Sequence, residues 1–353
     1  MKLGSLAGAC LSGAVLAACG SGVPSSVPAS VSPPAGALLS AAGSAPGHET
    51  NGNLYVANAG ASTVTLYAPG SNSVLRTISQ GVKAPDALAF DGALDLYVAN
   101  AGANTVTVYA PGSSSVLRTI SQGVNAPHAL AFDGAGNLYV ANAGANTVTV
   151  YAPGSSSVLR TISQSVNAPD ALVFGKSGNL VVGNVYDGGN SPGSVTVYAP
   201  GSKKSLHTLP QGSAPVALAF DGSGNLYVAN DSPPCCYQNW VTVYSPSKKL
   251  LRTINLVHHP DALAFDRSGN LYVADNGGKY IHPIGEITVY APGSNAVLRM
   301  FSSGVSHPVA LLFESSNLFV ANADTVTVYV HGGTLRRTIS QGVNGPRALA
   351  FGP

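Results

Sequence analysis

The sequence predicts an all-β fold, a seven-bladed β-propeller of four-stranded blades that follows a disordered N-terminal tether. A six-residue segment resembling Asn-Leu-Tyr-Val-Ala-Asn occurs seven times, at intervals of 42 to 47 residues. A period in the forties with short alternating strands is typical of propeller blades. The chain also ends with an unpaired strand that can complete the first blade. The seven copies begin at Asn53, Asp95, Asn137, Asn179, Asn225, Asn270 and Asn317.

One repeat shows the expected strands, named A to D outward from the centre of the ring. They cover 87–90, 96–99, 105–109 and 116–120. The C strand alternates with period two, as a strand should. Between C and D, Pro111 and Gly112 take the central positions of a type II turn. Between A and B, the Asp-Gly-Ala-Gly-Asn segment at 133–137 suits a tight hairpin. The Asn that ends each B strand is expected to cap the B–C turn.

Ring closure follows from the order of the strands. B, C and D strands come first, at 53–78, and a lone A strand comes last, at 347–351. We expect this last strand to complete the first blade, so that no sheet is left open. A single blade would be unstable, because both of its faces are apolar.

The N-terminus predicts a processing signal. Residues 1–18 combine Lys2 with an apolar stretch that is too short for a comfortable membrane span. The string Leu-Ala-Ala-Cys-Gly ending at Gly20 resembles a bacterial lipobox. That resemblance implies a lipoprotein signal peptide and lipidation of Cys19; the alternative is an ordinary signal peptide with an incidental cysteine.

The predicted domains after the signal peptide are a tether and the propeller. Residues 19–50 contain the lipidated Cys and a Pro/Ser/Ala-rich stretch that cannot bury a core, and residues 51–353 form the propeller. We expect a monomer in the bacterial cell envelope, held to the membrane by its lipid and facing the periplasm or the exterior. Charged residues make up 9% of the chain and the net charge is +2, without a basic run. This composition argues against nucleic acid as a partner.

The repeats resemble the NHL and YVTN-type propellers of secreted bacterial proteins. The resemblance rests on Pro-Asp-Ala-Leu-Ala-Phe-Asp-Gly-x-Gly-Asn-Leu-Tyr-Val-Ala-Asn, seen best at 127–142, with His128 for Asp, and at 260–275. It extends over everything past the tether. It implies the fold, and it allows binding, lyase and lactonase activities alike.

The B–C loops point to a binding face. Together with the D–A loops they form one side of a propeller, called the top face below. They are minimal in the first three repeats and longer in the next three, at 185–194, 231–240 and 276–286. Their aromatic and polar residues predict a recognition surface, although long loops can also be tolerated insertions. The candidate ligand-binding residues in these loops are Tyr186, Asp187, Tyr237, Trp240, Tyr280, His282 and Glu286.

A second candidate is the residue after the Pro that starts each A strand, near the mouth of the central channel. Four neighbouring blades carry charged or titratable side chains there, and two flanking carboxylates would favour the charged form of the His. We interpret them as a polar mouth that binds or polarises a ligand; the alternative is a set of ion pairs between blades that fixes their register. The four residues are Arg347, Asp86, His128 and Asp170.

Metal and disulfide sites are the remaining candidates. His and carboxylate side chains of the sixth and seventh repeats suit a divalent ion, but their spacing matches no compact motif, so we expect no cofactor. Cys235 and Cys236 are predicted to form a vicinal disulfide; buried thiols and intermolecular pairing are the alternatives. The candidate metal ligands are His258, His259, Asp261, His282, Glu286 and His307.

These features support three classes of function. The first is an envelope-anchored module without enzymatic activity that binds a protein, a glycan or a small molecule on its top face. The second is a metal-dependent lyase or lactonase, because the fold resembles the virginiamycin B lyase and gluconolactonase families. That resemblance implies a divalent ion at the top of the channel. The gluconolactonase resemblance would require a Glu ligand on an early inner strand. This chain has none there, since its glutamates are Glu49, Glu286 and Glu314. A lyase that uses His282 and Glu286 remains as the enzymatic alternative. The third is an assembly scaffold.

Overall fold

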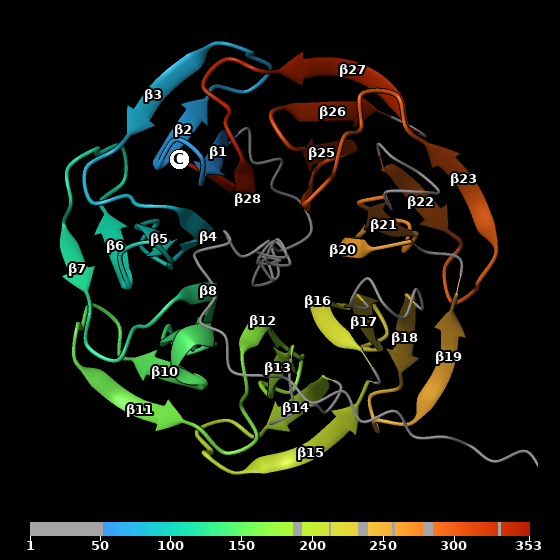
Figure 1. Cartoon of the computed structure of the whole chain (residues 1–353), viewed down its shortest axis with the longest axis horizontal. Helices are drawn as coiled ribbons and strands as arrows, with labels where there is room; N and C mark the ends of the chain where they lie inside the picture. Colours follow the sequence, from blue (N-terminus) through green and yellow to red (C-terminus); the bar gives the residue numbers. More distant parts are fainter. Residues whose placement is uncertain are drawn as a thin grey trace, which may run out of the picture. The chain divides into compact units, whose positions relative to one another are not determined.

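A computed structural model describes residues 52–185, 193–211, 213–231, 239–255, 258–277, 285–330 and 333–353. Within these ranges seven four-stranded antiparallel sheets are arranged as a ring (Figure 1), which confirms the all-β, seven-bladed prediction. A single 3₁₀ turn at Ala143–Ala145 is the helical element of the described ranges. No helix in them is long and apolar enough to span a membrane. The predicted signal peptide, Cys19, the tether, Cys235 and Cys236 lie outside the described residues.

Each blade runs outward from its A strand at the channel to its D strand at the rim. Blade 1 contains β28 (Pro346–Gly352), β1 (Asn53–Asn58), β2 (Thr63–Tyr67) and β3 (Val74–Ile78). Blades 2 and 3 contain β4 (Pro85–Phe90), β5 (Leu96–Asn100), β6 (Thr105–Tyr109), β7 (Arg118–Ile120), β8 (Pro127–Phe132), β9 (Leu138–Asn142), β10 (Thr147–Tyr151) and β11 (Val158–Ile162).

The other four blades repeat this order. Blades 4 and 5 contain β12 (Pro169–Phe174), β13 (Leu180–Asn184), β14 (Ser194–Tyr198), β15 (Ser205–Pro210), β16 (Ala214–Phe220), β17 (Leu226–Asp231), β18 (Trp240–Tyr244) and β19 (Leu250–Ile254). Blades 6 and 7 contain β20 (Pro260–Phe265), β21 (Leu271–Asp275), β22 (Glu286–Tyr290), β23 (Val297–Phe301), β24 (Ala310–Glu314), β25 (Asn317–Ala321), β26 (Val326–Val330) and β27 (Thr334–Ile339).

The predicted turns form with small differences. Ser113 N donates to Ala110 O at 3.0 Å, and Gly112 has a φ of 72°, as a type II turn requires. In the A–B hairpin, Asp133 Oδ1 accepts the backbone N–H groups of Ala135 and Asn137, each at 2.9 Å. The D strand expected at 116–120 is shorter, since β7 begins at Arg118.

The Asn that ends each B strand does more than cap the B–C turn. Asn100 Nδ2 donates to Val98 O and to Thr107 Oγ1 on strand C, at 3.2 and 3.0 Å. Its Oδ1 accepts the backbone N–H of Lys83 at 3.0 Å, in the loop that leads to strand A. One amide therefore joins strand C to the D–A loop and holds the two kinds of top-face loop together.

Neighbouring blades pack through their apolar faces. In blades 1, 2, 3, 5 and 6, the B-strand Tyr meets the Phe that ends the next blade's A strand in an edge-to-face contact, as Tyr55 does with Phe90 at a centroid distance of 5.0 Å. Phe319 and Phe351 make the same contact between blades 7 and 1. Such a pair contributes about 0.5–1.5 kcal/mol beyond its burial.

The last strand closes the ring, as predicted. β28 pairs antiparallel with β1, with Val56 opposite Leu349 and Leu54 opposite Phe351. The Tyr55 hydroxyl also donates to the Pro353 carbonyl oxygen at 2.9 Å. Blade 1 is therefore built from both ends of the propeller sequence.

Weakening the closing strand should destabilise the whole ring. Leu349 is 4% exposed, and Leu349→Ala should cost about 2–5 kcal/mol of unfolding free energy, because it leaves a cavity under β28. Leu75→Ala is the matched control, since Leu75 is 54% exposed and its loss should cost less than about 0.5 kcal/mol. Urea unfolding of the full chain measures both; equal effects would contradict the closing role of β28.

Candidate functional site

The described part of the top face contains only some of the residues predicted to bind a ligand. Trp240 and Glu286 are half-buried and begin the C strands β18 and β22. The residues that follow the A-strand prolines are also described. Tyr186, Asp187, Tyr237, Tyr280 and His282 lie outside the described residues.

A β-bulge directs the residue after each of these prolines. Pro85 pairs with Asn100 and Ala87 with Ala99, so that Asp86 is the extra residue between them. The same shift sets off His128, Asp170, Asp261 and Arg347 in their blades. A bulge re-aims a side chain and ends regular pairing. In blades 1 to 6 the repeat thus sets off one side chain at the start of the A strand, whereas β24 of blade 7 pairs with β25 without this bulge.

The structure brings Asp86, His128 and Asp170 together across three neighbouring blades. His128 Nδ1 lies 2.7 Å from Asp170 Oδ1, and His128 Nε2 lies 3.8 Å from Asp86 Oδ2. All three side chains are largely shielded from solvent, with exposed fractions of 20% for His128, 8% for Asp86 and 7% for Asp170. The imidazole therefore links the inner strands of blades 2, 3 and 4, as the sequence suggested.

Burial and charge compete in this first group. Burial raises the pKa of Asp86 to about 6, although the charges of His128 and Arg347 act to lower it. Burial alone would lower the pKa of His128. The hydrogen bond and charge of Asp170, with the charge of Asp86, outweigh it, so that the pKa of His128 is raised. The two flanking carboxylates therefore stabilise the charged imidazole of His128 against the effect of burial.

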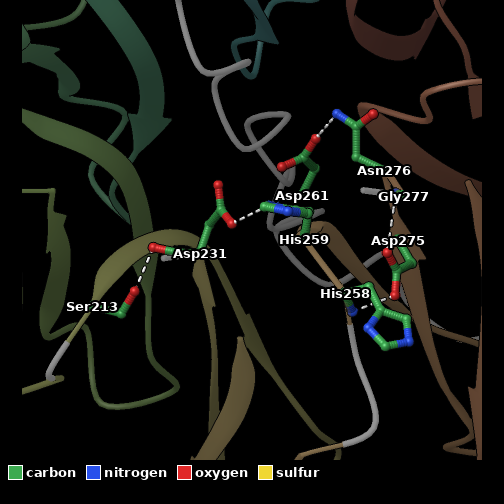
Figure 2. A network of polar contacts seen from close by, with 8 residues as sticks. All are labelled: Ser213, Asp231, His258, His259, Asp261, Asp275, Asn276 and Gly277. Atoms are coloured by element: carbon green, nitrogen blue, oxygen red, sulfur yellow. Dashed lines mark hydrogen bonds and ion pairs between the residues drawn. The ribbon is translucent and has the colours of Figure 1, made fainter. Parts of the chain in front are cut away.

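A second polar group lies on blades 5 and 6 (Figure 2). His259 Nδ1 is 2.7 Å from Asp231 Oδ1. This contact joins the D–A loop that leads into blade 6 to the end of β17 in blade 5. Asn276 Nδ2 donates to the Asp261 carboxylate, and the Ser213 hydroxyl donates to the Asp231 carbonyl oxygen. The side chains of His259 and Asp231 are 25% and 20% exposed, so a ligand on the top face can reach them.

Burial shifts the pKa of both buried carboxylates of this second group upward. Burial raises the pKa of Asp261 well above its usual range, and the charge of Asp231 adds to the effect. Burial likewise raises the pKa of Asp275, which accepts the backbone N–H groups of His258 and Gly277. The Asp231 hydrogen bond raises the pKa of His259. The group thus offers hydrogen-bond donors and acceptors together.

The backbone at His259 is strained. Its φ is 102°, whereas Ala84, Ala126 and Ala168 at the same position of earlier blades have φ values of 42° to 43°. Non-Gly residues rarely adopt either value, and such strain is a common feature of ligand sites. The bond to Asp231 and the following Pro260 hold the imidazole in this position.

Asp231 and Asn276 were not singled out by name from the sequence. Both directly follow the last residue of the repeated Asn-Leu-Tyr-Val-Ala-Asn segment. That position has Ala in blades 1, 2, 3 and 7 and Val in blade 4. Comparison of the blades at this one position would have identified them. Trp240 shows the same kind of departure, because blades 1, 2 and 3 have Thr where it stands.

The structure describes His258, His259, Asp261, Glu286 and His307 of the proposed metal ligands, and His282 lies outside the described residues. Among the described residues, no group of three or more His, Cys, Asp or Glu side chains could hold a metal ion. His259 instead pairs with Asp231, and His307 Nδ1 lies 3.4 Å from the hydroxyl of its neighbour Ser306.

Comparisons with known proteins extend to the fold alone. No protein-family model and no curated protein matches the chain. Among solved structures, the chain is similar to the hydrazine synthase of Kuenenia stuttgartiensis, with a TM-score of 0.68 and 18% identity. The match covers 81% of this chain and 94% of that one.

The His128 group predicts a pH-dependent contribution to stability. Because folding raises the pKa of His128, its contribution should be present near pH 6.5 and lost as the pH rises through the folded-state pKa. His128→Gln should therefore cost about 1.5 kcal/mol or more at pH 6.5, and less at pH 9. Urea unfolding at both pH values tests this, with His307→Gln as the control. A cost for His128→Gln that does not change with pH would contradict it.

Proposed function

We propose that this protein is a binding module that holds a polyhydroxylated ligand, a glycan, on the top face of blades 5 and 6. The proposal rests on one observation: residues that differ from those at the same positions of other blades lie together at one site. Asp231, His259 and Asn276 stand where other blades have Ala, and two bonds, from His259 to Asp231 and from Asn276 to Asp261, hold them.

The chemistry of these side chains suits sugar hydroxyls. Carboxylates accept hydrogen bonds, and the imidazole and the amide can both donate and accept. Trp240, at the start of β18, adds a large apolar surface with a polar edge. A sugar ring combines hydroxyl groups with an apolar face, so it can use both. Sites with a few placed polar groups beside an aromatic side chain are typical of small-ligand recognition.

The envelope location belongs to the same proposal. The lipobox-like string at Cys19 supports a lipid anchor, and the Pro/Ser/Ala-rich residues 20–50 support a spacer between the membrane and the propeller. A lipid-anchored monomer would then present its top face to envelope glycans.

Two substitutions that restore the repeat test the binding site. Trp240→Thr and His259→Ala introduce residues that other blades carry at the same positions, so both variants should fold. Each should weaken binding about tenfold or more, because loss of a hydrogen bond to a charged group or of an aromatic contact costs about 1.5–3 kcal/mol. Binding of the full chain to an array of bacterial envelope polysaccharides and peptidoglycan fragments measures this.

His307→Ala is the matched control, because His307 precedes the A strand of blade 7 just as His259 precedes that of blade 6. It should bind as the unmodified chain does. Absence of binding to every glycan would overturn the proposal, as would unchanged binding by both site variants. One bound divalent ion per chain, with a chelator-sensitive melting temperature, would favour the lyase alternative instead.

A further inference from the structure

Blades 6 and 7 enclose a hollow on the bottom face, the side of the ring that bears the A–B and C–D turns. These blades are neighbours in the ring (Figure 1), and the half-open space between them measures about 520 Å³. The hollow lies at the end of the blades that bears the A–B turns, opposite the top-face loops, and does not depend on the function proposed for them. Its lining includes Asp266, Arg267, Tyr272, Arg299, Phe301 and Phe313.

The hollow coincides with a break in the repeat. In blade 7 the A–B hairpin is shortened, with Glu314 opposite Asn317 and Ser315 at a φ of 54°. Its C–D segment at 330–333 reads Val-His-Gly-Gly, where blades 1, 2, 3, 4 and 6 have Ala-Pro-Gly-Ser. The shorter A–B hairpin of blade 7 leaves space beside the A–B turn of blade 6.

Arg299 on β23 differs from its counterparts in blades 2, 3 and 5. Arg118, Arg160 and Arg252 each donate to the B-strand Tyr hydroxyl of their own blade, at 3.0, 2.8 and 2.6 Å. The Nε of Arg299 is buried without a partner, as are the Nε atoms of these three, so the difference lies in the terminal amino groups. Those of Arg299 make no hydrogen bond to a described residue and can donate to an acceptor that a ligand supplies.

The nearby carboxylate does not serve as that acceptor. Asp266 Oδ1 accepts the backbone N–H groups of Ser268 and Asn270, each at 2.9 Å, and Oδ2 accepts Asn270 Nδ2 at 2.7 Å. These donors satisfy the carboxylate within its own turn. The guanidinium groups of Arg299 and Arg267 therefore leave the hollow attractive to an anion.

Aromatic side chains form the apolar part of the hollow. Phe301 stands where blades 1, 2, 3, 5 and 7 have Ile, and its ring centroid is 4.8 Å from that of Tyr329. The rings of Tyr272 and Phe313 meet edge to face at 4.9 Å. A ligand that fits must therefore combine an anionic end for Arg299 with an apolar body for these rings.

We propose that the hollow between blades 6 and 7 binds a small organic carboxylate with an aromatic or aliphatic body. A carboxylate matches the planar fork of a guanidinium through two parallel hydrogen bonds. The volume of the hollow lies within the range of small-molecule sites. Blade 6 combines an Arg that is not bonded to the B-strand Tyr, an Asp that is bonded within its own turn, and a Phe where other blades have Ile. Blades 2, 3 and 5 do not have this combination.

The test uses the full chain with phenylacetate and benzoate as probes and phenylacetamide and benzamide as uncharged controls. Calorimetric titration should show that each acid binds at least about tenfold more tightly than its amide. Arg299→Gln should lose this preference. Arg252→Gln, at the same position in blade 5, should retain it. Phe301→Ile restores the residue of other blades and should weaken binding of the acids and amides alike.

Three outcomes would overturn the proposal. They are no binding of either acid, equal binding of acids and amides, and an unchanged preference in Arg299→Gln. Melting curves of all three variants show whether each one is folded. If Arg299→Gln fails to fold, the Phe301→Ile result and the comparison of acids with amides still decide the question.

Discussion

Pairing of β28 with β1 is the contact on which the rest of this structure depends. Each blade is apolar on both faces, so every blade requires a neighbour on each side, and a chain of blades has no stable end until it closes. The closing contacts join residues almost 300 positions apart, as the bond between Tyr55 and Pro353 shows, with a sequence separation of 298. Without closure the seven A strands would not surround one channel, and their bulged side chains would not meet.

The same constraint explains where function can arise. The Asn at the end of strand B fixes the D–A loop against strand C, and the bulge after Pro turns one side chain toward the channel mouth. The repeat thus supplies a frame with variable positions on either side of the Pro that begins strand A. Changes there, such as Asp to His at 128 after the Pro or Ala to His at 259 before it, alter the site while the pairing of strands A and B is kept. Two groups result, one built around His128 and one around His259.

The fold was predictable from the sequence because it is encoded many times over. Strand order, blade number and closure follow from period, turn residues and the unpaired last strand. The His128 group was also predictable, since its three residues occupy one repeat position in consecutive blades. The partners of His259 were harder to find. Asp231 belongs to the preceding blade and Asn276 to the B–C loop, so their convergence depends on the packing of one blade against the next.

The bottom hollow was beyond sequence reasoning for a related reason. It arises because the A–B hairpin of blade 7 is short while that of blade 6 is complete, and because Arg299 lacks a bond that three equivalent arginines make. Neither fact is visible in a motif. Both facts are found by comparing the structures of the blades with one another, because the other blades show the arrangement from which blades 6 and 7 differ.

If the repeat specifies the fold and the departures from it provide recognition, exchanging the long loops should separate the two. The exchange replaces 231–239 and 276–285 with the Ala-Gly-Ala-Asn loop of blade 2 at 101–104, and the melting temperature and glycan binding are measured on the same sample. We predict an unchanged or higher melting temperature together with loss of binding. Retained binding, or unfolding of the ring, would contradict it.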